Sequence, residues 1–441
     1  MSAGSTDRDQ ETHLMNSQNY ERRRRKSVFA PLSLAFAVMT PLAVTGAAQA
    51  QEISGANEAM PTRWSTLLDA AVARRAADAD AVALRGSADA RRALSARRFA
   101  GPPEADASAR QDQIGSGTGY FEVEGGISAA LWRRGEREAL RGEADALAAR
   151  AGAELDVARL ELAGELRTAW WELAGAVADV RVGLEQVEFA QTLVANTKRL
   201  EAAGEQARLD LLQAEAALAM SEQDLAQAMG RERQARAQMT GLVGFVPAQL
   251  TAETVGAAQI DDHPLVRVAL AEADQLARQA RFARLKAEPA WRVGLDLRSE
   301  RDGRGLDTRT STGLKLSRAL GRDPSAGAEA ASLEAEATAA RSKAAAVRFS
   351  LETLQEQAIA NLTAARASLK AQEARRAISI EALALTERGW REGELPFLEL
   401  LRARAAASEA SLAAAQARVA VEAAISSFNQ AQGLLPQDQT S

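Results

Sequence analysis

A proline-free stretch, residues 134–201, constrains this chain more than any other feature of its sequence. Apolar side chains recur along it at spacings of three and four, the heptad pattern of helices in coiled-coil contact. They are Leu166, Trp170, Leu173, Val177, Val180, Leu184 and Val187. At ~1.5 Å per residue, a helix of this length extends roughly 100 Å. Ordinary globular helices are several-fold shorter, so the sequence predicts rods of helix.

A second helix returns from the end of the first. A break at Gly204 separates the two, and the returning helix is predicted from about Leu209 to Met239. Leu211, Leu218 and Leu225 give it an apolar stripe that matches the first helix. The Ala-rich composition favours both helices, because alanine has the highest helix propensity and lets helices approach closely.

The whole arrangement is written twice, at a constant offset of 189 residues. The segment 204–214 resembles 393–403, and two further anchors share that offset. These anchors pair Ser128, Ala130, Leu131 and Arg133 with Ser317, Ala319, Leu320 and Arg322, and Gly244 and Pro247 with Gly433 and Pro436. We therefore predict two structural repeats, residues 51–247 and 248–441, that pack as pseudo-symmetric partners.

Each repeat is predicted to contain a shorter helix, two alternating segments and a pair of longer helices. The helices of the first repeat are 64–97, 134–201 and 209–239. Those of the second are 264–287, 325–391 and 397–431, with a break at Gly393, and its alternating segments lie within 289–320.

The alternating segments have the period of two that is typical of β-strands with one apolar and one polar face. Residues 121–127, 292–298 and 312–317 show it clearly, and residues 104–110 show it weakly, with only alanines on the apolar face. Each strand is roughly ten residues long, the length that crosses a bilayer when tilted. Trp132 and Trp291 stand at the strand ends nearest the long helices, where membrane-interface aromatics are expected.

Two interpretations of these strands remain open. They can form a soluble β-hairpin layer lying against the helices, or they can lie in lipid. Four strands cannot close on themselves, and an open sheet edge in lipid is prohibitive because its backbone groups lack partners. Strands that span a membrane would therefore have to be shared with other copies of the chain.

The N-terminus carries the pattern of an export signal. A basic run, Arg22–Lys26, precedes an apolar stretch, Val28–Val44, and Ala48-Gln49-Ala50 supplies small residues for cleavage after Ala50. Met15 is a possible start of translation. The alternative is a membrane anchor, but two prolines interrupt a stretch that is short for spanning. No later stretch is apolar enough for a transmembrane helix, so insertion after export would have to use strands.

Composition and motif searches indicate no enzyme chemistry. The absence of cysteine excludes disulfides, thiolate metal sites and cysteine nucleophiles, and the net charge of −5 argues against nucleic acid as a partner. No metalloprotease, phosphate-loop or nucleophile-elbow motif is present. His263, before Pro264, is predicted to mark a helix start. We expect no catalytic residues, no metal site and no cofactor.

Four segments resemble the TolC-type outer-membrane efflux proteins: 131–135, 204–215, 263–266 and 393–401. Gly-Glu-Leu-Pro-Phe-Leu-Glu-Leu-Leu at 393–401 resembles the heavy-metal branch, which serves cobalt-zinc-cadmium and copper-silver exporters. The resemblance implies a mainly α fold with a small β part: duplicated coiled-coil hairpins and four membrane strands per chain. Three chains would form a trimeric α/β-barrel tunnel in the outer membrane of a Gram-negative bacterium.

That resemblance also implies a function and partners. The chain would be a passive exit duct for small solutes that docks onto a periplasmic adaptor protein and an RND-type inner-membrane pump. No cysteine follows the signal, so no lipid anchor is expected. Drug efflux or type I protein secretion in the same fold is the nearest alternative. A periplasmic coiled-coil adaptor or scaffold is the alternative of another class.

The family places its gate at the helical turns, here Gly204 and Gly393. By position, Asp210 resembles the gating aspartate, Glu399 resembles an aperture acid, and Trp390 stands where some members carry a gating tyrosine. Leu395 and Arg402 depart from the pattern, since the family has an arginine and an acid there. The acids also have a simpler interpretation, because acidic residues are favoured at helix starts by the macrodipole.

Overall fold

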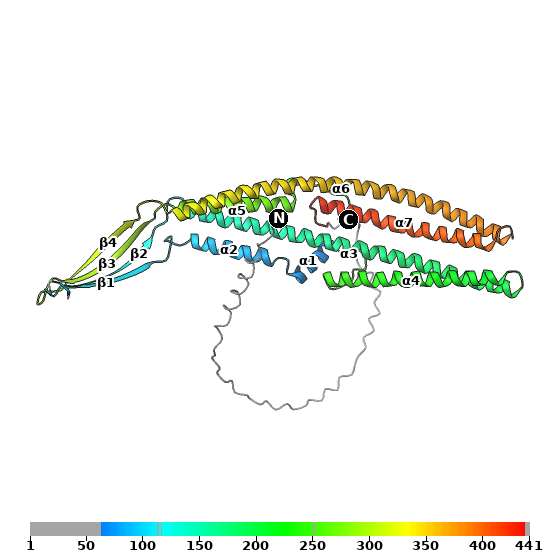
Figure 1. Ribbon diagram of the computed structural model, residues 1–441, viewed down its shortest axis with the longest axis horizontal. Helices are drawn as coiled ribbons and strands as arrows, with labels where there is room; N and C mark the ends of the chain where they lie inside the picture. Colours follow the sequence, from blue (N-terminus) through cyan, green and yellow to red (C-terminus); the bar gives the residue numbers. More distant parts are fainter. Residues whose placement is uncertain (1–62, 113, 116, 250–251, 437–441) are drawn as a thin grey trace, which may run out of the picture. The chain divides into compact units, whose positions relative to one another are not determined.

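The computed structural model describes residues 63–436 except 113, 116, 250 and 251, all within one compact unit (Figure 1). The predicted export signal, residues 1–50, lies outside the described residues. The elements are α1 (Trp64–Arg75), α2 (Ala79–Ser95), β1 (Glu104–Gln111), β2 (Phe121–Ala130), α3 (Glu136–Ala202), α4 (Arg208–Val243), the 3-10 turn η1 (Ile260–Asp262), α5 (Pro264–Lys286), β3 (Trp291–Arg301), β4 (Arg309–Arg318), α6 (Pro324–Arg391) and α7 (Phe397–Ala431).

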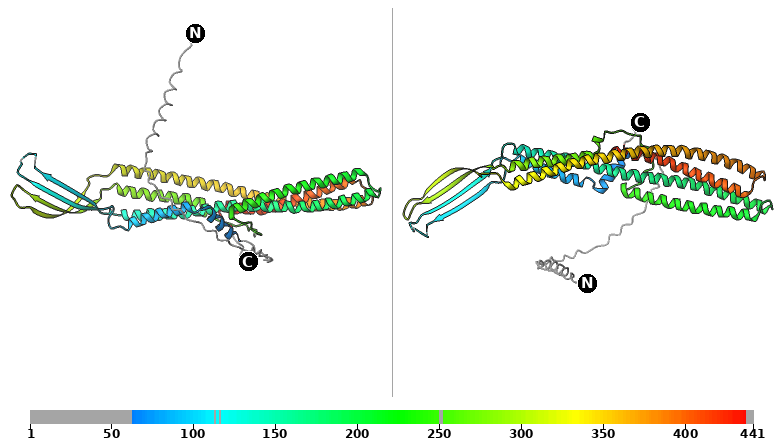
Figure 2. Two further views of the ribbon diagram at one scale, coloured as in Figure 1. Left: turned by 90° about the horizontal axis from the view of Figure 1, so that it is seen from below. Right: turned by 45° about the horizontal axis from the view of Figure 1, so that its top comes forward.

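The predicted long helices are confirmed. α3 has 67 residues and α6 has 68, and the returning helices α4 and α7 have 36 and 35. α3 packs against α4, α6 packs against α7, and α3 also lies against α7, so the two hairpins are joined side by side (Figure 2). Glycines at four turns, Gly204, Gly393, Gly244 and Gly433, all have positive φ, and the members of each pair are 189 residues apart.

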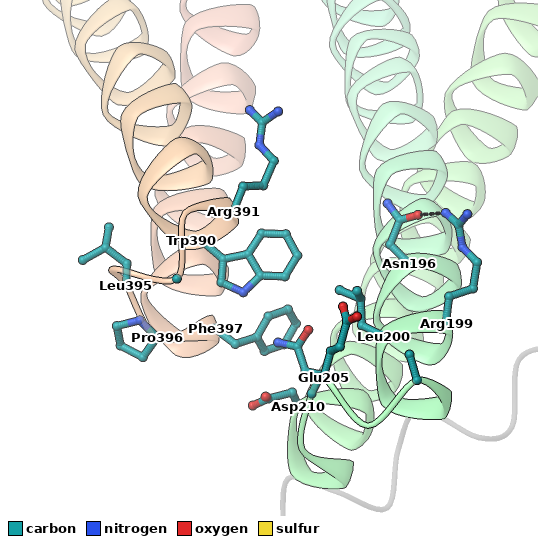
Figure 3. Close-up of a pocket in the computed structure, with 13 residues that line it drawn as sticks. Asn196, Arg199, Leu200, Glu205, Asp210, Trp390, Arg391, Leu395, Pro396 and Phe397 are labelled. Carbon is teal, nitrogen blue, oxygen red and sulfur yellow. Dashed lines mark hydrogen bonds between the residues drawn. The ribbon is translucent and has the colours of Figure 1, made fainter.

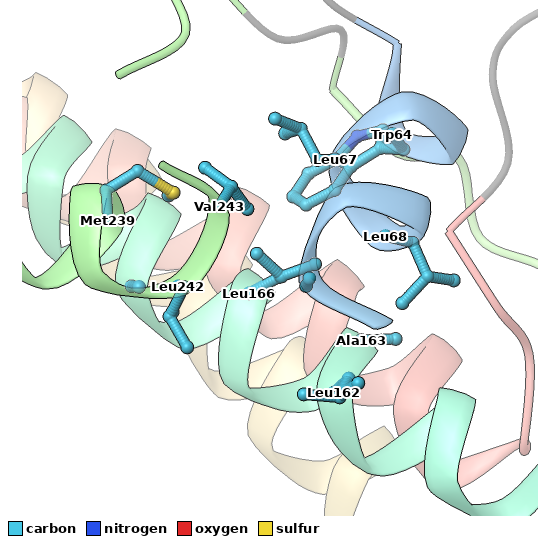
Figure 4. Close-up of a cluster of buried hydrophobic side chains, with 11 residues drawn as sticks. Trp64, Leu67, Leu68, Leu162, Ala163, Leu166, Met239, Leu242 and Val243 are labelled. Atoms are coloured by element: carbon cyan, nitrogen blue, oxygen red, sulfur yellow. The ribbon is translucent and has the colours of Figure 1, made fainter. Parts of the chain in front are cut away.

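The first predicted helix, 64–97, is wrong as a single element. It is divided into α1 and α2 at Ala76, whose φ of 47° lies in the left-handed region. The break lets α1 turn so that Trp64 and Leu67 bury themselves against Leu166 of α3 and Met239 of α4 (Figure 4). Burying these large side chains outweighs the cost of about 1–2 kcal/mol for a left-handed alanine.

The apolar seam of α3 follows the heptad spacing, but two of its predicted members are not buried within the single chain. Val177 and Leu184 are 43% and 50% exposed, whereas their neighbours Ala176 and Gly183 are buried. A Cβ at Gly183 would stand 3.2 Å from the Leu225 side chain, so the missing side chain lets α4 approach closely. Small residues thus form this part of the seam, as they do where helices pack tightly.

Four antiparallel strands form one sheet in the order β1-β2-β3-β4. Their register places charged and polar residues on one face, with Asp106, Gly126, Asp296 and Gly313 forming one row across it. The other face carries exposed apolar residues: Phe121, Val123, Ile127, Leu295, Leu297, Leu314 and Leu316. Within the described sheet, β1 and β4 are the outer strands, each paired along one side.

The sheet and the helical turns stand at opposite ends of the long helices. β2 leads into the start of α3 and β4 into the start of α6, whereas Gly204 and Gly393 follow the ends of those helices (Figure 1). Among the described residues, no helix has both the length and the apolar character that crossing a membrane requires.

Candidate functional site: the cleft between the hairpin tips

The two hairpin tips are built by the same turn. Gly204 has a φ of 77° and donates its N–H to Glu201, while the N–H of Glu205 reaches the carbonyl of Leu200. Gly393, with a φ of 76°, repeats this with Trp390, and Glu394 repeats it with Gly389. This pair of bonds satisfies the last carbonyls of a helix and requires a left-handed residue, which glycine adopts without strain.

An apolar cluster joins the two hairpins just above the tips. Its buried members come from four helices: Leu193 of α3, Ala214 of α4, Leu383 of α6, and Phe397, Leu400 and Ala407 of α7. Phe189 and Trp390 pack against it, and the Trp390 and Phe397 ring centroids are 6.0 Å apart. The cluster holds the tips side by side because separating them would expose this apolar surface to water.

A cation lies within the same junction. The guanidinium carbon of Arg404, on α7, stands 3.4 Å from the centre of the Phe189 ring, on α3. Burial lowers the pKa of Arg404 from its ordinary value, against the opposing effect of Glu387 and Glu185. The side chain remains charged, and we call the contact between Arg404 and Phe189 the Arg–Phe latch.

Below the latch, the two tips enclose a cleft of 860 Å³. Figure 3 shows Trp390 and Phe397 pointing from the second hairpin toward the first, where Leu200, Glu205 and Asp210 line the opposite wall. The second hairpin thus supplies the aromatic side chains of the cleft, and the first supplies its two carboxylates, Glu205 and Asp210, together with Arg199.

Asp210 and Glu399 hold matching places but differ in their surroundings. Both stand in the first turn of a helix, α4 or α7. An oxygen of Glu399 lies 2.7 Å from a guanidinium nitrogen of Arg402, one turn along the same helix. Within the described residues, no hydrogen bond or ion pair engages the Asp210 carboxylate, which faces the cleft. Arg402 therefore supplies Glu399 with a counter-ion.

Leu395, the other residue that departs from the family pattern, packs within its own hairpin tip. Its side chain packs onto Gly389, where an added Cβ would meet it at 2.9 Å. In Figure 3 it points away from the first hairpin. Leu395 thus makes an apolar contact that stays within the second tip.

Trp132 and Trp291 both stand at the helix-proximal end of the sheet. Trp291 begins β3, and its carbonyl accepts a hydrogen bond of 2.7 Å from Leu131. The Trp132 indole donates to the carbonyl of Arg97, and Arg318 lies over the Trp291 ring.

A buried polar network in the middle of the helices was missed from the sequence. Arg167 of α3 and Glu253 make a two-pronged ion pair of 2.8 and 2.6 Å. Glu253 also accepts from Ser426 and Asn429 of α7. Burial alone would raise the pKa of Glu253, but Arg167 and these donors hold it below its ordinary value. The partners are far apart in sequence, so no local pattern signals the network.

The described residues contain no group of three or more His, Asp or Glu side chains placed to hold a metal ion together. His263 caps α5 as predicted, because its Nδ1 accepts a hydrogen bond of 3.2 Å from the N–H of Leu265. Burial lowers the pKa of His263 from its ordinary value.

No protein-family model matches the sequence, and no curated protein does either. Solved structures do match. The outer-membrane channel OprN is 23% identical over 84% of this chain and 89% of its own, with a TM-score of 0.65. The outer membrane protein VceC from Vibrio cholerae is 17% identical over 84% and 96%, also with a TM-score of 0.65.

The channel CusC gives a comparable match. It is 16% identical over 84% of this chain and 92% of its own, with a TM-score of 0.65. Each of the three matches covers more than four fifths of both chains. The described chain therefore has the fold of the TolC-type outer-membrane efflux channels.

Proposed function

We propose that this protein is the outer-membrane exit duct of a tripartite efflux system, working as a homotrimer. Each chain would contribute its four strands to one closed sheet in the membrane, and its two hairpins to a tunnel below. The chain would add no chemistry of its own. It would lower the barrier to export by replacing lipid with a water-filled path.

One observation carries this proposal: the exposed apolar face of the four-stranded sheet. Leu295, Leu314 and Leu316 are 68%, 76% and 62% exposed, and the opposite face is charged. Such a contiguous apolar surface is costly in water but is matched by lipid. Trp132 and Trp291 would then stand at the membrane interface. The proposed division into repeats, residues 51–247 and 248–441, accounts for the two hairpins.

The tips would form the closed end of the duct and the docking region for the periplasmic adaptor protein and the RND-type pump. Asp210 faces the cleft between them and Trp390 lines its other wall, so both are gate candidates. Glu399 would tune the gate less, because Arg402 neutralises it. Gly204 and Gly393 would set the shape of the two tips.

We propose heavy-metal cations as the cargo. The resemblance of 393–401 supports this, as does the fold shared with CusC, from the heavy-metal branch. OprN and VceC match the fold equally well, so the fold itself does not select the cargo, and drug efflux or type I protein secretion stays the alternative. A deletion strain more sensitive to cobalt, zinc, cadmium or copper, with unchanged drug resistance, would support the metal cargo.

Cell fractionation tests the location and assembly together. We expect the protein, exported by its N-terminal signal, to sediment with outer membranes and to migrate as a detergent-resistant trimer. An adaptor or scaffold protein would instead be recovered in the soluble periplasmic fraction. Recovery there as a monomer would contradict the proposal.

A further inference from the structure

The repeated architecture defines how one copy of this chain would join the next. In one chain, β2 of the first half pairs with β3 of the second. The outer strands, β4 and β1, are the counterparts of β2 and β3, and each pairs on one side only within the described sheet. Since this inference rests on the proposed shared sheet, its partner is a second copy of the chain.

The counterpart residues follow from the registers within the two hairpins. Ser128 of β2 corresponds to Ser317 of β4 through the 189-residue offset. Ser128 pairs with Glu104 in the first hairpin, and Ser317 pairs with Arg292 in the second, so Glu104 and Arg292 are also counterparts.

The pairing of β2 with β3, between the two halves of one chain, then gives the pairing of β4 with β1 between two copies. Ser128 pairs across that junction with Gly294, which is two residues beyond Arg292. The matching position is two residues beyond Glu104, which is Asp106. We propose that β4 pairs antiparallel with β1 of the next copy with Ser317 opposite Asp106, and therefore with Leu316 opposite Ala107.

The faces and charges of the two strands agree with this register. A shift by one residue would place the β4 leucines among charged side chains, because the side-chain period is two. A shift by two residues in one direction would set Lys315 directly opposite Arg110, and like charges in that position are destabilising. A shift by two residues in the other direction would set Lys315 opposite Asp106. Charge does not exclude this alternative register, so an experiment must distinguish it from the proposed one.

The helices also carry a sign that a neighbouring copy packs against this chain, at the surface of α6. In the Arg–Phe latch, Arg404 of α7 covers Phe189 of α3. Through the 189-residue offset, Phe189 corresponds to Ile378 of α6, and Arg404 corresponds to Glu215 of α4. Ile378 is 67% exposed in the single chain. The symmetry that pairs β4 with β1 would also place α4 of a neighbouring copy against α6, over Ile378.

Disulfide trapping tests the register, and the absence of native cysteine makes each engineered pair report only on itself. Leu316→Cys is combined with Ala107→Cys as the matched pair, and with Ala105→Cys or Ala109→Cys as shifted pairs. The full-length protein is oxidised in its membranes and run on a non-reducing gel. Strand neighbours have Cα atoms about 5 Å apart, whereas a shift of two residues makes that distance roughly 8 Å, beyond disulfide reach.

We expect the matched pair to give covalent trimers in at least ~10-fold greater yield than either shifted pair, because only its Cα atoms fall within bonding distance. A higher yield from Ala105→Cys or Ala109→Cys would overturn the register while leaving the shared sheet intact. The absence of cross-links in a protein that remains trimeric would also overturn it. A protein that is monomeric in every variant would refute the proposed function itself.

Discussion

A mutation in the Arg–Phe latch tests whether the joined tips close the proposed duct. Phe189→Leu keeps an apolar side chain in the cluster but removes the aromatic face beneath Arg404. A partly desolvated cation–π contact contributes about 2 kcal/mol. Losing it would leave a half-buried guanidinium without its ring and would shift the ratio of separated to joined tips by about 30-fold for each chain.

Single-channel recording in planar bilayers measures this shift, and we expect Phe189→Leu to increase conductance or the time spent open. Phe282→Leu is the matched control, because Phe282 also lies near a cation, with the Lys286 nitrogen 5.6 Å from its ring centre, but on α5. It should leave conductance unchanged. If Phe189→Leu gives a folded trimer that conducts like the unaltered protein, the latch does not hold the tips together.

Four further predictions concern the cleft, the buried network and the tip turn. Asp210→Asn should raise conductance in planar bilayers more than Glu399→Gln, because Asp210 lines the cleft with no ion pair among the described residues, whereas Glu399 is paired with Arg402. Equal effects would favour a helix-start role for both acids. Glu253→Gln should lower the free energy of unfolding, measured by circular dichroism in denaturant, by about 3–5 kcal/mol because a buried charge loses its partner. Glu409→Gln, at an exposed ion pair, should cost under about 1 kcal/mol, and similar values would refute the distinction. The pKa of Glu253 is lowered in the folded state, so its contribution should be present above about pH 4.5 and be lost as the pH falls through the folded-state pKa; a flat acid profile would contradict this. Gly204→Ala should destabilise the tip turn by about 1–2 kcal/mol, seen as faster amide exchange confined to the tip, because alanine is strained at positive φ; exchange unchanged at the tip would count against the turn geometry.

Much of the fold could be predicted because it is written in local, repeated patterns. The heptad spacing and the lack of proline gave the long helices to within a few residues, and strict alternation gave the strands. Even the weak segment 104–110 is a strand, because β2 lies beside it and supplies hydrogen-bond partners along its length. The errors arose where packing overrides pattern, as at Ala76, where α1 turns to bury Trp64.

The junction between the hairpins could not be predicted in the same way. Phe189 and Arg404 are more than two hundred residues apart, and Glu253 is 86 residues from Arg167 and 176 from Asn429. None of these contacts belongs to a periodic pattern. The apolar seam of α3 shows a second limit of prediction from the sequence. Hydrophobicity favoured Val177 and Leu184, but the close approach of α4 required the smaller neighbours Ala176 and Gly183. Large apolar residues then remain on faces that the single chain leaves exposed.

Whether the apolar face of the sheet lies in lipid is the central claim, and depth-dependent quenching tests it most directly. A fluorescent probe is attached to Leu295→Cys on the apolar face or to Ser311→Cys on the polar face, in protein reconstituted with brominated lipids. The account predicts strong quenching of the probe at 295 and little at 311. Equal or absent quenching at both positions would show that the sheet does not lie in the membrane.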